Sequence, residues 1–252
     1  MTVTPWPDGR LIAFDTETTG TEWEMDRIVA ASVVAVGAGR EPEVTTWLVN
    51  PGVEIPEAAT AVHGITTDRA RADGQDPVTA IAAIADRLVS LMDGGSPLIV
   101  FNARFDLTLL DRECRRYDLP VLPDRLLSRE LLPVIDPLVL DKQVQPYRRG
   151  SRRLPDLCAH WRVRHDKRHA SDADALAAAR LAWRIGRTYP RLGAMDLHEL
   201  HALQVERAAQ QATSLQSYLR RTDATAHVEG RWPYVPHTTN SASTDTAEGK
   251  QR

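Results

Sequence analysis

The chain has 252 residues, of which 42% are apolar and 26% charged, with a formal net charge of −3. This length and balance predict a folded globular protein of one large or two small domains, and they exclude a disordered chain, a collagen-like repeat and a disulfide scaffold. No apolar run is long enough to span a membrane, and the N-terminus lacks a signal-peptide pattern. We therefore expect a cytoplasmic protein with two reduced cysteines and no membrane partner.

The net charge is an average over two opposed parts of the chain. Residues 142–168 carry nine basic side chains against two acids, or +7, which leaves the other 225 residues at −10. Arginine supplies 28 of the 31 basic side chains and its planar fork suits phosphate, although a coding bias toward Arg and Ala explains the composition as well. The pattern predicts an acidic body with one basic segment, in which Arg148 and Arg149 are candidate substrate contacts.

Hydrophobic patterning predicts strands first and then an alternation of helices and strands. The expected strands are 11–14, 26–36, 43–49, 98–101 and 134–135, and the expected helices are 77–92, 103–117, 154–161, 172–189 and 195–221. Short connections among the first three strands favour an antiparallel meander, and Asn102 is a candidate N-cap. This order predicts an α/β fold with a mixed sheet of antiparallel and parallel strands flanked by helices.

Two acids, Asp15 and Glu17, end the first apolar strand, in the run Leu-Ile-Ala-Phe-Asp-Thr-Glu-Thr-Thr-Gly. Side chains two residues apart on a strand point to the same face. Two carboxylates so close repel one another unless a cation or proton lies between them, so the pair suits a divalent metal with oxygen ligands. Taken alone, an acidic turn after a strand is the plainer interpretation.

Two more polar groups follow predicted elements. Asp106 comes just after a buried apolar strand, where an acid in the first turns of a helix is also favoured by the helix macrodipole. His169 stands five residues before Asp174, so His169 must lie in the loop before the helix if both side chains are to reach one site. The plainer interpretation is a solvated loop histidine and a capping box that runs from Ser171 to Asp174.

In this order, the motifs D-T-E-T-T-G, N-A-x-F-D and H-x-x-x-x-D resemble the DnaQ-like DEDDh family of 3′–5′ exonucleases, which includes the proofreading epsilon subunit of bacterial DNA polymerase III. The resemblance covers residues 9–188 and implies a ribonuclease H-like sheet. The stretch 55–66, which contains His63, looks like the loop that the family places near the substrate's 3′ end. Two positions depart from the family: Ala58 stands where a Glu is common, with Glu57 beside it, and Phe101 replaces a frequent His.

The resemblance implies a two-metal hydrolysis that releases 5′-nucleoside monophosphates from the 3′ ends of single-stranded DNA. Two Mg²⁺ or Mn²⁺ ions would be held by four acids, Asp15, Glu17, Asp106 and Asp174. His169 would act as general base. Substrate contacts are expected from Thr16, Thr18 and His63, and Trp23 is expected either to stack on a base or to anchor its own loop.

Two other functions fit the same residues. One is an RNA-trimming 3′–5′ exoribonuclease, because a metal cage does not distinguish the sugars. The other is a non-catalytic interaction protein whose helix at 195–221 docks on a polymerase. Proofreading would require a DNA polymerase in trans. The expected regions are an exonuclease domain at 1–190, a helical extension at 191–235 and a disordered tail at 236–252.

Overall fold

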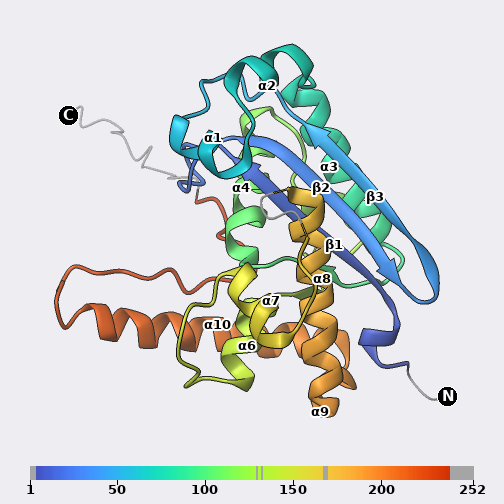
Figure 1. Ribbon diagram of the computed structural model, residues 1–252, viewed down its shortest axis with the longest axis vertical. Coiled ribbons are helices and arrows are strands. Elements are labelled where there is room, and N and C mark those ends of the chain that lie inside the picture. The colour runs from blue at the N-terminus through green and yellow to red at the C-terminus, as the bar shows by residue number, and fades with distance from the viewer. Residues whose placement is uncertain (1–3, 129, 132, 167–169, 239–252) are drawn as a thin grey trace, which may run out of the picture.

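The computed structural model describes residues 4–128, 130–131, 133–166 and 170–238. Its centre is a five-stranded sheet in the order β3-β2-β1-β4-β5 (Figure 1). β1 (Arg10–Thr18), β2 (Ile28–Gly37) and β3 (Arg40–Leu48) form an antiparallel meander. β4 (Leu98–Ile99) pairs in parallel with β1, and β5 (Val134–Ile135) pairs in parallel with β4. The mixed α/β sheet expected from the sequence is confirmed.

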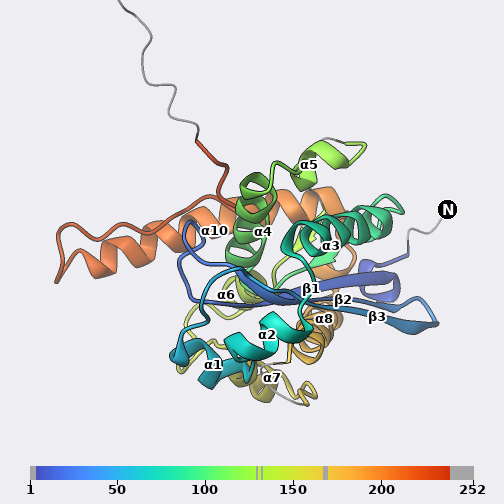
Figure 2. The same cartoon turned by 90° about the horizontal axis from the view of Figure 1, so that it is seen from above.

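Helices cover both faces of the sheet because its central strands are apolar on both sides. Along β1, Ile12 and Phe14 pack into one core cluster, and Leu11 and Ala13 pack into the other. α3 (Pro77–Met92) and α4 (Ala103–Arg116) close the first core, and α7 (Leu154–Trp161) and α8 (Ser171–Thr188) close the second. Figure 2 shows these two helical layers on opposite sides of the sheet.

The remaining helices are short, apart from one. They are η1 (Trp6–Asp8), α1 (Glu57–His63), α2 (Thr67–Asp73), α5 (Leu122–Arg125), α6 (Pro137–Val144), α9 (Pro190–Gly193) and the long α10 (Leu197–Leu219). The helices predicted at 77–92 and 154–161 have their expected bounds, and the others end within two residues of them. The first strand continues to Thr18, because its pairing with β2 carries it through the acidic motif.

α10 borders the sheet at β5, whose outer edge would otherwise leave backbone groups without partners. The Val134 N–H donates to His201 Nδ1 at 3.1 Å, and Gln204 Nε2 donates to the Val134 carbonyl at 3.0 Å. Beyond this contact α10 extends away from the body, and the chain then returns beside it toward α4 (Figures 1 and 2). None of the helices in the described ranges is long and apolar enough to cross a membrane. Most of the expected tail, residues 239–252, lies outside the described residues.

Candidate active site

Three carboxylates from two elements meet at the carboxyl end of β1. Asp15 and Glu17 share one face of the strand, and Asp174 comes from the first turn of α8 on that face. One oxygen of each lies within 4.8 Å of an oxygen of the other two. Hard oxygen ligands at this spacing fit a divalent cation such as Mg²⁺ or Mn²⁺.

A buried contact between two serines positions Asp174. Ser171 opens α8, and its hydroxyl lies 2.7 Å from the hydroxyl of Ser32, which pairs with Asp15 across the β1–β2 ladder. The helix N-cap is Ala170 and no side chain caps it, so the expected capping box is wrong. The Ser171 hydroxyl is bonded to the sheet instead, which aims the next turn of α8 at the end of β1.

Asp106 reaches the site from α4, on the opposite face of the sheet. Its Oδ1 accepts hydrogen bonds from Thr16 N at 3.1 Å and from Thr16 Oγ1 at 2.6 Å. Asn102 stands at the predicted N-cap in the left-handed region (φ 58°), but its side chain makes no cap. The buried carboxylate of Asp136 caps the helix in its place and accepts the N–H groups of Asn102 and Ala103, each at 3.0 Å.

The crowded acids perturb one another's titration. Burial, followed by the charges of Asp106, Asp174 and Glu17, raises the pKa of Asp15 well above its usual range. Burial and then the charge of Asp174 raise the pKa of Glu17 to about 7, and burial raises the pKa of Asp106 to about 7. A bound cation would relieve both the repulsion and the cost of burying these charges.

A histidine that the sequence analysis did not select contacts this group. His165 Nε2 bonds to Asp174 Oδ1, and the histidine side chain is only 5% exposed. The predicted general base, His169, lies outside the described residues. The sequence signal for His165 was only its place in the same loop before α8.

A cavity of about 260 Å³ opens beside Glu17 and is lined by His63 and Arg69 among others. His63 is the last residue of α1, which Gly64 ends with a φ of 73°. The predicted 3′-end loop thus lies next to the acidic group. Glu57 lines a separate cavity, so the acid that departs from the family position does not face this one. Arg69 was not predicted as a site residue.

The loop after the first motif is anchored to the body. Thr18 Oγ1 donates to the Gly20 carbonyl at 2.7 Å, within this loop. Trp23 packs against the core that α3 and α4 close. Glu24 accepts two hydrogen bonds from Arg112 Nε of α4, both at 2.9 Å. Trp23 therefore anchors its own loop, which is one of the two roles expected for it.

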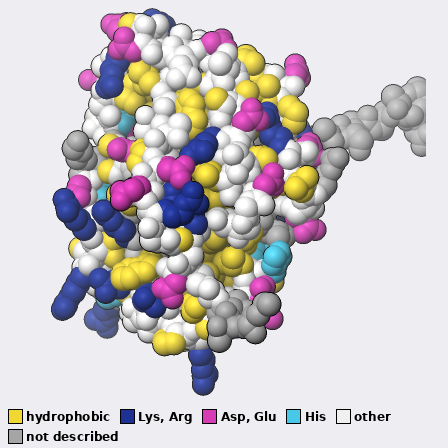
Figure 3. Space-filling view, turned by 90° about the vertical axis from the view of Figure 1, so that its right-hand side faces the viewer, with side chains coloured by type: hydrophobic (Ala, Val, Ile, Leu, Met, Phe, Trp, Pro, Cys, Tyr) yellow, Lys and Arg dark blue, Asp and Glu magenta, His cyan; other side chains and the backbone are white. Residues whose placement is uncertain are grey.

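The basic segment is divided between the interior and the surface. Asp141, fully buried in α6, bonds to Arg152, and Arg148 Nε lies 3.8 Å from it. Arg149 and Arg153 are exposed. On the face shown in Figure 3, basic side chains are interspersed with acidic and apolar ones.

An exonuclease family model, RNase_T, matches residues 12–182. The chain is 39% identical over 132 residues to a DNA polymerase III subunit epsilon-like protein of Rhodobacter capsulatus, covering 50% of this chain and 18% of that protein. It is 28% identical over 171 residues to a DNA polymerase III PolC-type of Streptococcus pyogenes, covering 68% and 11%. The chain thus spans less than a fifth of the length of these relatives.

Two solved structures share the fold. Escherichia coli Exonuclease I in complex with a dT13 oligonucleotide matches with a TM-score of 0.60 and 20% identity, over 73% of this chain and 42% of that one. Exonuclease X in complex with 5′ overhanging duplex DNA matches with a TM-score of 0.55 and 22% identity, over 77% and 99%. These likenesses confirm the fold class expected from the sequence.

Proposed function

Because the chain belongs to the RNase_T exonuclease family, whose model spans residues 12–182, we propose that it is a metal-dependent 3′–5′ exonuclease acting on single-stranded DNA. The observation that carries the proposal is the group of three carboxylates whose oxygens lie within 4.8 Å of one another. Asp106, held by Thr16 at 2.6 Å, supplies a fourth acid from the other face of the sheet. This set suits Mg²⁺ or Mn²⁺ better than a softer metal.

The protein's part in the reaction is to hold cations, place the strand and move one proton. Asp15, Glu17, Asp106 and Asp174 would hold two divalent ions, which supply an activated water and neutralise the charge that develops on the phosphate. We assign the general base to His169, five residues before Asp174. His165, bonded to Asp174, keeps that ligand oriented.

The cavity beside Glu17 is the proposed place of the terminal nucleotide. His63 and Arg69 line it, so an imidazole and a guanidinium lie beside the proposed place of a sugar or phosphate. The hydroxyls of Thr16 and Thr18 already donate within the protein. A substrate contact at either threonine would use the remaining acceptor capacity of its oxygen.

DNA is proposed in preference to RNA because two matching structures hold DNA, one with a dT13 oligonucleotide and one with a duplex. The two relatives compared are named for DNA polymerase III, which supports a proposed action beside a DNA polymerase. Both points support our proposal that the protein acts in the cytoplasm, where the chromosome is. The division into a domain at 1–190, an extension at 191–235 and a tail from 236 stays a proposal of the same kind.

A degradation assay tests the function. The purified protein is incubated with matched 5′-labelled DNA and RNA strands, with Mg²⁺, Mn²⁺ or EDTA, and products are resolved by length. We expect metal-dependent shortening of DNA from the 3′ end, lost in Asp15→Asn and kept in the exposed control Asp156→Asn. Equal activity in Asp15→Asn and wild type would refute the proposal. Faster RNA shortening would favour the exoribonuclease, and partner binding without nuclease activity would favour the interaction protein.

The two histidines are separated by single substitutions. His169→Ala should lower kcat by about 10²–10⁴-fold, the usual contribution of a general base. His165→Ala should lower kcat less. It should also raise the metal concentration needed for half-maximal activity, because its neighbour Asp174 is a proposed metal ligand. The reverse order of the two losses in kcat would transfer the role of base to His165.

A further inference from the structure

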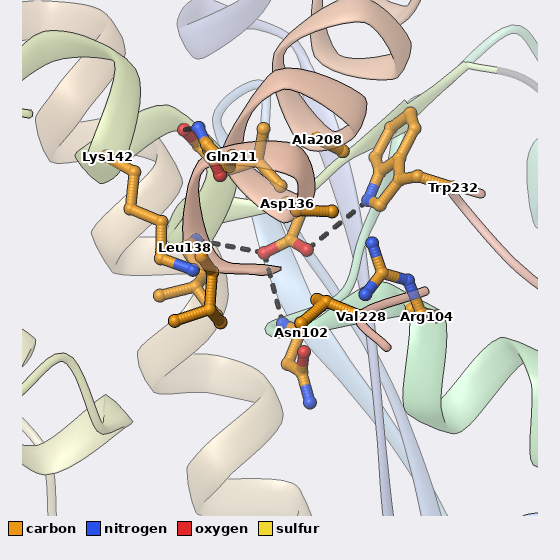
Figure 4. A pocket seen from close by; sticks show the side chains of 12 residues that line it. Asn102, Arg104, Asp136, Leu138, Lys142, Ala208, Gln211, Val228 and Trp232 are labelled. Atoms are coloured by element: carbon orange, nitrogen blue, oxygen red, sulfur yellow. Dashed lines mark hydrogen bonds between the residues drawn. The ribbon is translucent and has the colours of Figure 1, made fainter. Parts of the chain in front are cut away.

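Another cavity lies at the N-terminus of α4, between α4, α6, α10 and the chain that follows α10. Its volume is about 80 Å³, and its lining includes Asn102, Arg104, Lys142, Leu215 and Trp232 (Figure 4). A space of this size holds a few water molecules or one phosphate-sized group, and it is too small for a nucleoside. Asn102 is exposed, so the cavity is open to solvent at its α4 end.

Two cations line this cavity from opposite sides. Lys142 comes from α6 and Arg104 from α4, and Figure 4 shows them on either side of Asp136. Within the described ranges, neither has a carboxylate at ion-pair distance, and Lys142 has no hydrogen-bond partner. Arg104 Nε donates to the Arg231 carbonyl at 2.7 Å. Burial lowers the pKa of both side chains, which shows that their charges are held at a cost.

Asp136, the one acid among the described residues that line the cavity, already has hydrogen-bond donors around it. Its carboxylate accepts the N–H groups of Asn102, Ala103 and Leu138 at 2.9–3.0 Å, and the Trp232 indole lies 3.4 Å away. These donors disperse the negative charge of Asp136. They also use the free amides at the start of α4, so any anion in the cavity would be bound by side chains.

The cavity stands close to the proposed reaction site. Asn102 precedes Asp106 by four residues, which is one turn of α4, or about 6 Å along the helix axis. If the terminal phosphodiester lies at the acidic group, this nearby opening is within reach of one of the next phosphates of the strand. Within the described ranges these two desolvated cations have no ion pair at contact distance, and the nearby carboxylate of Asp136 is held by other donors. They are therefore suited to a phosphate, because the anion offsets the cost of burying them.

We propose that Lys142 and Arg104 bind a single backbone phosphate of the substrate strand, upstream of the bond that is cleaved. The inference rests on the proposed exonuclease function. It gives α10 and the chain after it a role in the site, since Leu215 and Trp232 line the cavity. It also predicts a minimum strand length, because a strand too short to reach the cavity forgoes this contact.

A scan of neutral linkages tests the assignment. Single-stranded DNA oligonucleotides, each with one methylphosphonate at a successive position from the 3′ end, are titrated by fluorescence anisotropy against the inactive Asp15→Asn protein. In this background a methylphosphonate at one position should weaken binding by about tenfold, because it removes one charge-assisted contact. Adding Lys142→Met should remove that penalty at that position alone and lower the log–log salt slope by about 0.7.

Lys142→Arg is the matched control, because it keeps the charge and should keep the position-specific penalty. Arg104→Gln supplies a second test that does not depend on Lys142. Thermal unfolding of each variant shows whether it remains folded. Inorganic phosphate and a nucleoside monophosphate serve as competitors, and a thermal shift with either that Lys142→Met abolishes, together with a flat scan, would assign the cavity to a free anion and overturn the strand contact.

The failures of the two proposals are distinguishable. The phosphate assignment alone is overturned if the protein degrades DNA but no methylphosphonate position weakens binding. It is also overturned if the same position weakens binding equally with and without Lys142→Met. A wild-type protein that neither binds nor degrades DNA overturns the exonuclease function and this assignment with it.

Discussion

Replacing Asp15 by Asn should stabilise the metal-free protein while it abolishes activity. Oxygens of Asp15, Glu17 and Asp174 lie within 4.8 Å of one another. At that distance two unit charges repel by about 3–4 kcal/mol with an effective dielectric of about 20. Protons bound by the group relieve part of this repulsion. We therefore expect a gain of about 1–3 kcal/mol at pH 8, or roughly 3–10 °C in Tm for a chain of this length.

The stability that Asp15→Asn gains over wild type should increase as the pH rises. The pKa of Glu17 is about 7 in the folded protein against an ordinary 4.5, so the folded state binds more protons between those values. The contribution of Glu17 to the stability of the metal-free wild type therefore falls as pH rises from 4.5 to 7, by at most about 1.4 kcal/mol per pH unit. The loss is complete above pH 7. Asp15→Asn removes one neighbouring charge, so its stability should fall less over the same interval.

Thermal unfolding from pH 5 to 8, with EDTA and then with Mg²⁺ or Mn²⁺, measures both effects. Metal should raise the Tm of wild type in proportion to its binding to the folded state and should raise that of Asp15→Asn much less. Asp156→Asn is exposed on α7 and should change stability by less than about 0.5 kcal/mol. A variant less stable than wild type in EDTA at pH 8, or metal shifts of equal size in both proteins, would refute the reasoning.

Three further changes address the supports of the site. Ser32→Ala and Ser171→Ala each break the buried 2.7 Å contact between the two hydroxyls. A double-mutant cycle of unfolding free energies in urea should give a coupling of about 1 kcal/mol, and kcat should fall in each single variant. Additive losses of stability would contradict this role. Asp141→Ala leaves Arg152 without its buried carboxylate and should cost about 2–4 kcal/mol of unfolding free energy by urea titration, whereas a neutral result would mean that solvent already screens the pair. Burial lowers the pKa of His201 to about 4, so the contribution of this neutral histidine to stability should fall by about 2 kcal/mol as pH drops from 6.5 to 4, opposite in sign to that of Glu17. Urea midpoints of His201→Gln, compared with those of wild type, should lack this contribution, and equal pH profiles would contradict it.

The sequence predicted the elements whose residues contact the core with a regular period. β1 alternates between two cores and α3 repeats its apolar residues at helical spacing, so their positions were readable. α1 has no buried residue and α2 has one, so neither shows a periodic face, and both were missed. The convergence of the acids followed from a family pattern, because sequence spacing alone gave no distance between Asp106 and β1.

What the sequence did not reveal depends on contacts between distant segments. Asp136 was not selected, although it caps α4 from 33 residues away and so fixes the helix that carries Asp106. Its hydrogen-bond partners come from separate elements, and no local pattern marks a residue with that role. His165 was missed for the same reason, since its contact with Asp174 depends on how the loop from α7 returns to α8.

Only part of the +7 charge of residues 142–168 is exposed in the folded protein. Arg152 and Arg148 lie against Asp141, whose carboxylate is fully buried, so part of the +7 segment stabilises the α6–α7 connection. A cation committed to a buried carboxylate contributes little to the field outside the protein. Arg149 and Arg153 are exposed in the same connection, so under the proposed function they are the arginines of this connection expected to attract a phosphate backbone. We infer that the alternation of inward and outward arginines lets one short segment hold the fold together and attract substrate.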